Sequence, residues 1–231
     1  MRKILFSAVL LLALLLAFEI GVTFLSERGF QKALKSQYGM PDSLKVSINS
    51  FPLTLSLIRN HLGQLRMTWE GQVNTITPSG QEENPTYFGQ INLYDVELNM
   101  PALLRTRLEI RQISRIKAAI ILTEESLNLA LGIQNDDIIV ADGEIFKANT
   151  NPKVQYKLKV LNGDTLSMEP LSGSIGDSDY LQNPQSALQA SSATATFGTL
   201  PLDGRLQSAS IEGDKAVIDM AIPIWEGYIE I

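Results

Sequence analysis

The sequence predicts an α+β domain, built mainly from antiparallel strands and preceded by an N-terminal transmembrane helix. Three observations lead to this fold class. The first 25 residues are almost entirely apolar, segments with alternating apolar and polar residues recur along the rest of the chain, and Gly-containing turns separate several of them. The 231 residues are 45% hydrophobic and 19% charged, which is enough apolar material for one domain with a substantial core.

The N-terminal segment is expected to be a membrane anchor. Its apolar run, residues 4–25, is interrupted once by Glu19, and a helix needs roughly 20 apolar residues to cross the hydrocarbon core. Arg2 and Lys3 precede the run, so the positive-inside rule places the rest of the chain outside the cytoplasm. Leu15 stands where a cleavage site before Phe18 would need a small residue, which favours an uncleaved signal-anchor over a signal peptide. We therefore divide the chain into this segment, residues 1–25, and one folded domain, residues 26–231.

A short amphipathic helix and a strand are expected next. Ser26 can cap the helix, which Gly39 and Pro41 then stop. The apolar stripe of the helix consists of Phe30, Leu34 and Tyr38. Apolar and polar residues alternate over residues 44–49, which predicts a half-buried strand.

A second short helix and a second strand are expected between residues 52 and 70. Pro52 suits the first turn of a helix that Gly63 ends. Its apolar residues are Leu53, Leu57, Ile58 and Leu62. The following strand has one apolar face, formed by Leu65, Met67 and Trp69. Residues 74–85 are rich in turn-forming residues and are expected to be a surface loop.

The strand after this loop changes the parity of its apolar residues. Ile91 and Leu93 belong to one face, whereas Val96, Leu98 and Met100 have the opposite parity. A β-bulge near residues 94–95 would keep both sets on the core side, and Pro101 would end the strand.

The best-specified helix is expected at residues 124–131, after a β-prone run at residues 118–122. Thr123 is a good N-cap, Glu124 and Glu125 suit the positive end of a helix dipole, and Gly132 ends the helix. Its apolar stripe consists of Leu127, Ala130 and Leu131.

Three hairpins are expected in the second half of the chain. Asp142-Gly143 joins residues 138–140 to 145–146, Asn162-Gly163 joins 158–160 to 166–168, and the turn at Gly213 joins 206–211 to 216–222. Residues 172–196 are rich in Ser, Gln, Asp and Ala, with one or two helical turns expected from Pro184.

Composition and motifs argue against most enzyme and metal chemistry. The chain has no Cys and one His, which excludes disulfides, thiol nucleophiles, iron–sulfur clusters and His-based metal clusters. It contains no phosphate-binding loop, dinucleotide fingerprint or serine-hydrolase elbow. His61 is expected to be a partly exposed residue of the second short helix. The acidic residues at 136–144 and 177–179 lack the order of a calcium loop. We therefore expect no catalytic residue, no metal and no cofactor.

The charge balance argues against a nucleic-acid partner. The net charge is −6, from 25 acidic and 19 basic residues, and no stretch of Lys and Arg is dense enough to follow a phosphate backbone. Any membrane affinity of the folded part is therefore expected to be mainly apolar.

A ligand groove is one consequence of the predicted fold. A long sheet covered by few helices buries its apolar face only by curling, and curling leaves an elongated interior that side chains need not fill. Such an interior can hold an acyl chain. A fully packed core is the alternative, and apolar periodicity does not separate the two.

Several segments of the sequence carry a family resemblance through their order and spacing. They are the apolar N-terminal segment, residues 46–53 (VSINSFPL), 62–68 (LGQLRMT), 91–98 (INLYDVEL), 122–128 (LTEESLN), the pair Asp142-Gly143, and residues 200–202 and 204–206 (LPL and GRL). Together they resemble the bacterial LmeA-like phospholipid-binding family over nearly all of the chain after Ser26. Phe51-Pro52 before a helix and residues 123–128 (TEESLN) are the most specific of these segments.

The resemblance implies a phospholipid-binding envelope protein with a tubular, lipid-binding-like fold, in which a strongly curved antiparallel sheet wraps around short helices. Together with the predicted anchor, it indicates a single-pass protein of the inner membrane, with its domain in the periplasm or extracytoplasmic space and a role in lipid handling for envelope maintenance. The candidates for the acyl-chain lining are Leu53, Leu57, Ile58, Leu62, Met67, Trp69, Leu127, Ala130 and Leu131. Burial of each methylene is worth about 0.8 kcal/mol, so part of one acyl chain would give useful affinity without a charged clamp.

Two other functions are compatible with the sequence. A non-catalytic scaffold or assembly protein of the envelope would use the same apolar residues to contact a protein partner. An envelope hydrolase that uses distant carboxylates would need a buried acidic residue with a raised pKa in a cleft.

Overall fold

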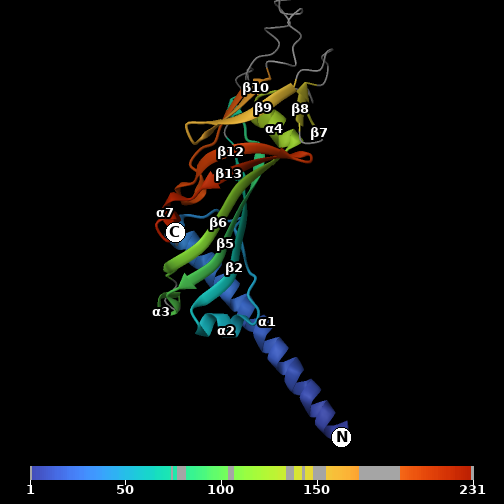
Figure 1. Ribbon diagram of the computed structural model, residues 1–231, viewed down its shortest axis with the longest axis vertical. Helices are drawn as coiled ribbons and strands as arrows, with labels where there is room; N and C mark the ends of the chain where they lie inside the picture. The colour runs from blue at the N-terminus through green and yellow to red at the C-terminus, as the bar shows by residue number, and fades with distance from the viewer. Residues whose placement is uncertain are drawn as a thin grey trace, which may run out of the picture. The chain divides into compact units, whose positions relative to one another are not determined.

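The computed structural model of the protein describes residues 2–73, 75–76, 82–103, 107–133, 138–141, 144–147, 155–171 and 193–229. These residues form the predicted α+β fold of antiparallel sheets with one long N-terminal helix (Figure 1). They divide into two compact units, the first comprising residues 1–68, 91–117 and 225–231 and the second residues 69–90 and 118–224. Three long strands, β2 (His61–Gln72), β5 (Thr86–Leu98) and β6 (Ile110–Thr123), contribute residues to both units.

Helix α1 spans Arg2–Tyr38 without a break, so the helix that we expected to begin at Ser26 is the continuation of the apolar segment. Residues 26–38 contain no Pro, their one Gly costs only about 1 kcal/mol in a helix, and a Ser that can cap a helix is also accepted within one. Phe30 and Leu34 are fully buried, as their stripe predicted. Gly39, at φ +62°, ends the helix in the left-handed conformation typical of a C-terminal cap.

The N-terminal half of α1 differs in exposure from its C-terminal half. Its large apolar side chains from Phe6 to Leu25 are exposed. The stretch beginning at Phe6 is long enough and, with a mean hydropathy of 2.5, apolar enough to cross a membrane by length and composition. The division of the chain at residue 25 remains a prediction, because one helix runs through that boundary.

The first unit also contains β1 (Lys45–Ile48), α2 (Leu53–Ile58) and α3 (Met100–Leu103). β1 pairs antiparallel with β2, with Val46 opposite Met67 and Ile48 opposite Leu65, as their alternating patterns predicted. β2, β5 and β6 follow in the sheet. The second half of α1 packs on β1.

Helix α2 is shorter than predicted. It ends at Ile58, and Asn60, at φ +58°, turns the chain directly into β2. His61 and Leu62 are therefore strand residues, and the prediction of a helix up to Gly63 was wrong. The Asn60 carbonyl accepts a 2.9 Å hydrogen bond from the Leu98 N–H, which holds this turn against the end of β5.

The predicted change of parity in β5 is confirmed. Asp95 adopts φ +51°, and Ile91 and Leu93 before it and Val96 and Leu98 after it are all buried. One left-handed residue shifts the alternation by one position, so both sets reach the core. Met100 does not continue the strand but begins α3.

The C-terminal residues of the described chain pack against β6 in the first unit. Trp225, in the short helix α7 (Pro223–Glu226), is buried and meets Tyr38 edge to face, with ring centroids 5.9 Å apart. The Ile113 N–H donates to the Tyr228 carbonyl at 2.8 Å, and Ile113 bridges to Ile229.

In the second unit, the sheet of β2, β5 and β6 continues with β13 (Lys215–Ala221) and β12 (Arg205–Glu212). A five-stranded antiparallel sheet has the order β11-β10-β9-β8-β7. Its strands are β7 (Ile138–Ala141), β8 (Glu144–Lys147), β9 (Gln155–Leu161), β10 (Thr165–Pro170) and β11 (Ala193–Thr196). Helix α4 (Glu124–Ala130) packs on β7 and β13, and the 3-10 turn η1 (Pro201–Asp203) precedes β12.

The three predicted hairpins are confirmed by their registers. Val140 pairs with Ile145, Leu158 with Met168, and Ile211 with Ala216. Asn162 and Gly163 have positive φ, as does Gly213. The turn at Asp142-Gly143 and the predicted helical turns from Pro184 lie outside the described residues. Within the predicted loop at residues 74–85, β3 (Thr75–Ile76) pairs with β4 (Glu82–Glu83), a short ladder that the turn residues did not indicate.

Candidate functional site

Five of the predicted lining residues lie in the first unit. Leu53 on α2 and Leu62 and Met67 on β2 are fully buried. Leu57 is half-buried, and Ile58 is 71% exposed on α2. The structure therefore places three of the five in the core of the unit, whereas Ile58 is accessible from solvent.

The other four lie in the second unit and are all buried. They are Trp69 on β2, Leu127 and Ala130 on α4, and Leu131 at the end of α4. One helix face thus supplies three apolar side chains to the core of this unit, as the spacing of the stripe predicted.

Local hydrogen bonds fix the position of α4. Thr123 is the N-cap, and its hydroxyl accepts a hydrogen bond from the Ser126 N–H at 3.3 Å, as predicted. The Glu124 carboxylate accepts a 2.8 Å hydrogen bond from the Val140 N–H of β7. The same first turn therefore caps the helix and ties it to the neighbouring strand.

Two aromatic rings of the second unit lie directly on glycines of the adjacent strand. A Cβ at Gly89 would stand 2.1 Å from two indole atoms of Trp69, and a Cβ at Gly71 would stand 2.3 Å from Cζ of Tyr87. Burial raises the pKa of the Tyr87 hydroxyl. These contacts were not predicted from the sequence, although a Gly inside a strand signals the close approach of another group.

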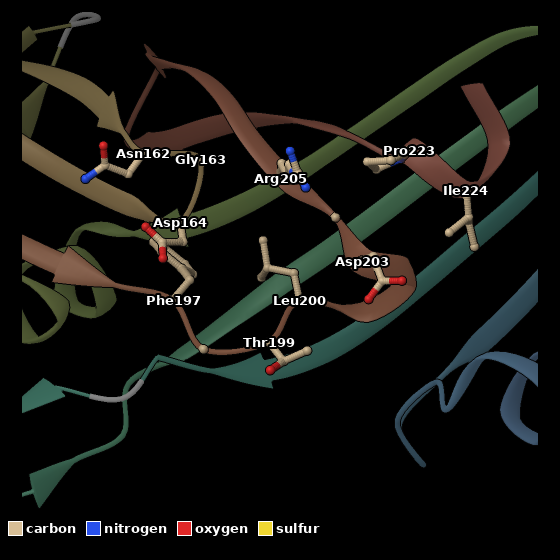
Figure 2. A pocket seen from close by; sticks show the side chains of 12 residues that line it. Asn162, Gly163, Asp164, Phe197, Thr199, Leu200, Asp203, Arg205, Pro223 and Ile224 are labelled. Carbon is tan, nitrogen blue, oxygen red and sulfur yellow. The ribbon is translucent and has the colours of Figure 1, made fainter. Parts of the chain in front are cut away.

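A pocket of about 940 Å³ opens in the second unit (Figure 2). Three parts of the chain line it: the turn between β9 and β10, residues 197–205, and the start of α7. Its main apolar residues are Phe197, Leu200 and Ile224, and its charged residues are Asp164, Asp203 and Arg205. The lining is thus amphipathic, with two carboxylates and one guanidinium.

Left-handed backbone conformations shape both sides of this pocket. Asn162 and Gly163 have φ of 55° and 75°, and Leu202 and Asp203 have φ of 61° and 52°. The Gly163 carbonyl accepts a 2.7 Å hydrogen bond from the Leu206 N–H, which joins the two turns. Because the two carboxylates outnumber the guanidinium, the pocket is not suited to a simple anion.

Comparison with known families gives a match over both units. The model of the LmeA-like phospholipid-binding family matches residues 21–221, nearly the whole chain. The chain belongs to the LmeA-like phospholipid-binding family. No curated protein and no solved structure matches the chain. The match runs from Gly21, in the middle of α1, to Ala221 at the end of β13. It therefore excludes Glu19 and most of the apolar segment.

The LmeA-like sequence segments map onto several features described above. Residues 91–98 include the positive-φ position of β5, residues 122–128 include the cap of α4, and residues 200–206 supply one wall of the pocket. Residues 200–206 carried part of the family resemblance in the sequence, but none of them was predicted to line a pocket. The Asn162-Gly163 turn was visible in the sequence, but only the folded chain brings it to residues 200–206, where the Leu206 N–H donates to the Gly163 carbonyl.

The one histidine of the LmeA-like chain lies near a carboxylate on the surface. His61 Nε2 lies 3.9 Å from Asp95 Oδ1, and both side chains are at least half exposed. Among the described residues, no group of three His, Asp or Glu side chains is placed to hold a metal ion. The acidic residues at 136, 137, 142, 177 and 179 lie outside the described residues.

Proposed function

We propose that this protein is a membrane-anchored, extracytoplasmic phospholipid-binding protein that holds acyl chains against apolar side chains and takes part in lipid handling in the cell envelope. The family match supports lipid binding, and it is the observation that carries the proposal. The buried residues Leu53, Leu62 and Met67 in one unit, and Leu127 and Ala130 in the other, are the proposed acyl contacts.

The anchoring part of the proposal depends on α1. Its exposed apolar side chains from Phe6 to Leu25 would be unfavourable in water and are favourable in a bilayer. Arg2 and Lys3 at its start favour a cytoplasmic N-terminus, so the folded units would lie on the other side.

The side of the membrane can be tested directly because the chain has no Cys. Ser36→Cys places one thiol at an exposed position of α1 beyond the apolar half. We expect it to react with a membrane-impermeant maleimide once the outer membrane is permeabilised. Reaction only after lysis of the inner membrane would contradict the extracytoplasmic location.

Lipid binding is tested with the full chain in a mild detergent, since truncation at residue 25 would interrupt α1. We expect native mass spectrometry to resolve a stoichiometric phospholipid adduct, which organic extraction then identifies. A chain without an adduct that also takes up no added phospholipid would contradict the proposal and favour the scaffold alternative.

A pair of variants separates an acyl-filled interior from a packed core. Ala130→Leu adds volume at a fully buried position of α4, whereas Ser210→Leu adds a similar side chain at an exposed position of β12. If Ala130 faces lipid, Ala130→Leu lowers lipid occupancy with little loss of stability, and Ser210→Leu leaves occupancy unchanged. If Ala130 faces a packed core, the same variant costs about 1–3 kcal/mol and leaves lipid occupancy unaltered.

A further inference from the structure

Helix α2 exposes large apolar side chains instead of burying them. Phe51, just before the helix, is 79% exposed, and Leu55 and Ile58 are 50% and 71% exposed. Leu55 and Ile58 are three residues apart and therefore neighbours on one helix face. Leu53 is the buried residue of the same short helix. Three large apolar side chains exposed this close together in the chain indicate a surface that contacts a membrane or another molecule.

The position of α2 along α1 is fixed by Glu19, the one charged residue inside the apolar run. The Thr54 hydroxyl donates to Glu19 Oε2 at 2.6 Å, and the Thr54 N–H donates to Oε1 at 3.1 Å. The Leu53 N–H also donates to Oε1. The carboxylate therefore satisfies the first N–H groups of α2, which lies beside α1 (Figure 1).

This attachment places α2 at a definite depth. The exposed apolar part of α1 ends at Leu25, and Glu19 lies six residues earlier, or roughly 9 Å along the helix axis. Apolar faces of interfacial helices enter the boundary between headgroups and acyl chains by roughly 5–10 Å. If Leu25 lies at the headgroup boundary, the apolar face of α2 lies at the depth of an interfacial helix.

Basic side chains follow the apolar part of α1, at the level where lipid phosphates would lie. Arg28, Lys32 and Lys35 line one hollow on the next turns of α1, and the Arg28 guanidinium lies 4.1 Å from the centre of the Phe24 ring. Arg59 is exposed directly after α2. Along α1, the apolar side chains end at Leu25, and the basic side chains follow one to three turns later. This order matches the acyl-chain and phosphate layers of a phospholipid leaflet.

We infer that α2 is a membrane-interface element, which inserts Phe51, Leu55 and Ile58 into the outer half of the bilayer that α1 crosses. The inference rests on the proposed anchoring by α1, but it does not depend on acyl chains inside either unit. It would hold the first unit against the membrane surface, where a lipid-binding protein meets its ligand. It also assigns a role to Glu19. Its carboxylate accepts hydrogen bonds from the start of α2, and therefore costs less free energy near the interface than a carboxylate without hydrogen-bond donors.

The test uses the full chain in vesicles of phosphatidylethanolamine and phosphatidylglycerol. Single variants Leu55→Cys and Ile58→Cys each carry an environment-sensitive fluorophore, and spin-labelled lipids act as quenchers. Leu16→Cys, in the middle of the apolar run, is the reference inside the bilayer. Ser36→Cys is the control outside it, because it lies roughly 16 Å beyond Leu25 along the same helix.

We expect the labels at residues 55 and 58 to be quenched at least half as strongly as the label at residue 16, with little quenching at residue 36. Quenching at residue 16 alone would overturn the inference while leaving the anchor in place. Labels at 55 and 58 that neither the spin-labelled lipids nor iodide added to the aqueous phase can quench would also overturn it, because this face of α2 would then be covered by the protein itself. Lipid adducts in the mass spectrum report separately on the proposed function.

A second variant tests the link to α1. Glu19→Ala, combined with the label at residue 58, removes the carboxylate that holds the start of α2. We expect quenching at residue 58 to fall by half or more while quenching at residue 16, measured in the same background, is unchanged. Unchanged quenching at both positions would overturn the role assigned to Glu19.

Discussion

Gly89 offers a direct test of how tightly the second unit is packed. Replacing it with Ala would place a Cβ 2.1 Å from Cε2 and Cζ2 of the Trp69 indole and 2.7 Å from Cδ2. Carbon atoms normally approach to about 3.5–4.0 Å, so the ring or the strand would have to move by more than 1 Å. Trp69 is 2% exposed, which leaves its ring no free space on the solvent side.

The expected loss in the free energy of unfolding is large for a substitution that adds one carbon atom. Overpacking a core costs about 1–3 kcal/mol and occasionally more, and displacement of a whole indole belongs at the upper end. We therefore expect Gly89→Ala to lower the free energy of unfolding by about 3 kcal/mol. Gly29→Ala is the matched control, because a Cβ there meets nothing within 4 Å and Ala favours a helix over Gly by about 1 kcal/mol.

The assay is urea unfolding of the full chain in a mild detergent, followed by circular dichroism. A third variant, Trp69→Leu, and its combination with Gly89→Ala complete a double-mutant cycle. If the indole causes the clash, Gly89→Ala costs little once Trp69 is replaced. A loss below about 1 kcal/mol for Gly89→Ala alone, or an equal loss in both backgrounds, would refute the reasoning.

Three further predictions concern single positions. Thr123→Ala removes the hydroxyl that caps α4 and should cost about 1 kcal/mol in the same assay, whereas Thr123→Ser should cost much less. Asp95→Gly should be tolerated at φ +51°, whereas Asp95→Val should destabilise the chain by at least about 1 kcal/mol, since a β-branched residue is strained in that conformation. Burial raises the pKa of Tyr87 and of Tyr156, so the folded state retains protons that the unfolded state releases. The stability that depends on these hydroxyls is therefore complete below pH about 10 and declines above it. Tyr87→Phe should make that decline shallower in unfolding curves recorded from pH 8 to 11, and an unchanged slope would contradict the assignment.

Much of the local structure followed from the sequence alone. The alternation in β1 and β2, the Thr123 cap, the parity change near Asp95 and the Asn162-Gly163 turn are set by residues close together in the chain. Side-chain periodicity and turn chemistry act over a few residues, so they can be inferred without knowing the fold. The same holds for the apolar run of α1, whose composition alone suits a bilayer.

The candidate site was predictable only in part. Leu127, Ala130 and Leu131 lie in the core because the face of a helix follows from spacing. Ile58 was grouped with Leu53 in one apolar stripe, yet five residues place their side chains roughly 140° apart around a helix, and Ile58 is exposed. The turn at Asn60 ends the helix early, so Leu62 belongs to β2. A short apolar run fits a helix or a strand about equally well, and the neighbouring strand decides between them.

Tertiary structure alone determined the contacts between distant residues. In the sequence, Glu19 is one tolerated charge in a membrane segment, and in the fold it holds the start of α2, whose residues come more than 30 positions later. Gly71 and Gly89 indicate a close approach in the sequence, but only the fold shows that the approaching groups are the rings of Tyr87 and Trp69. Residues close together in the chain thus set which faces are apolar and where the hairpins turn. The fold determined what each face meets, because that depends on pairings whose energies are summed over the whole chain rather than over one segment.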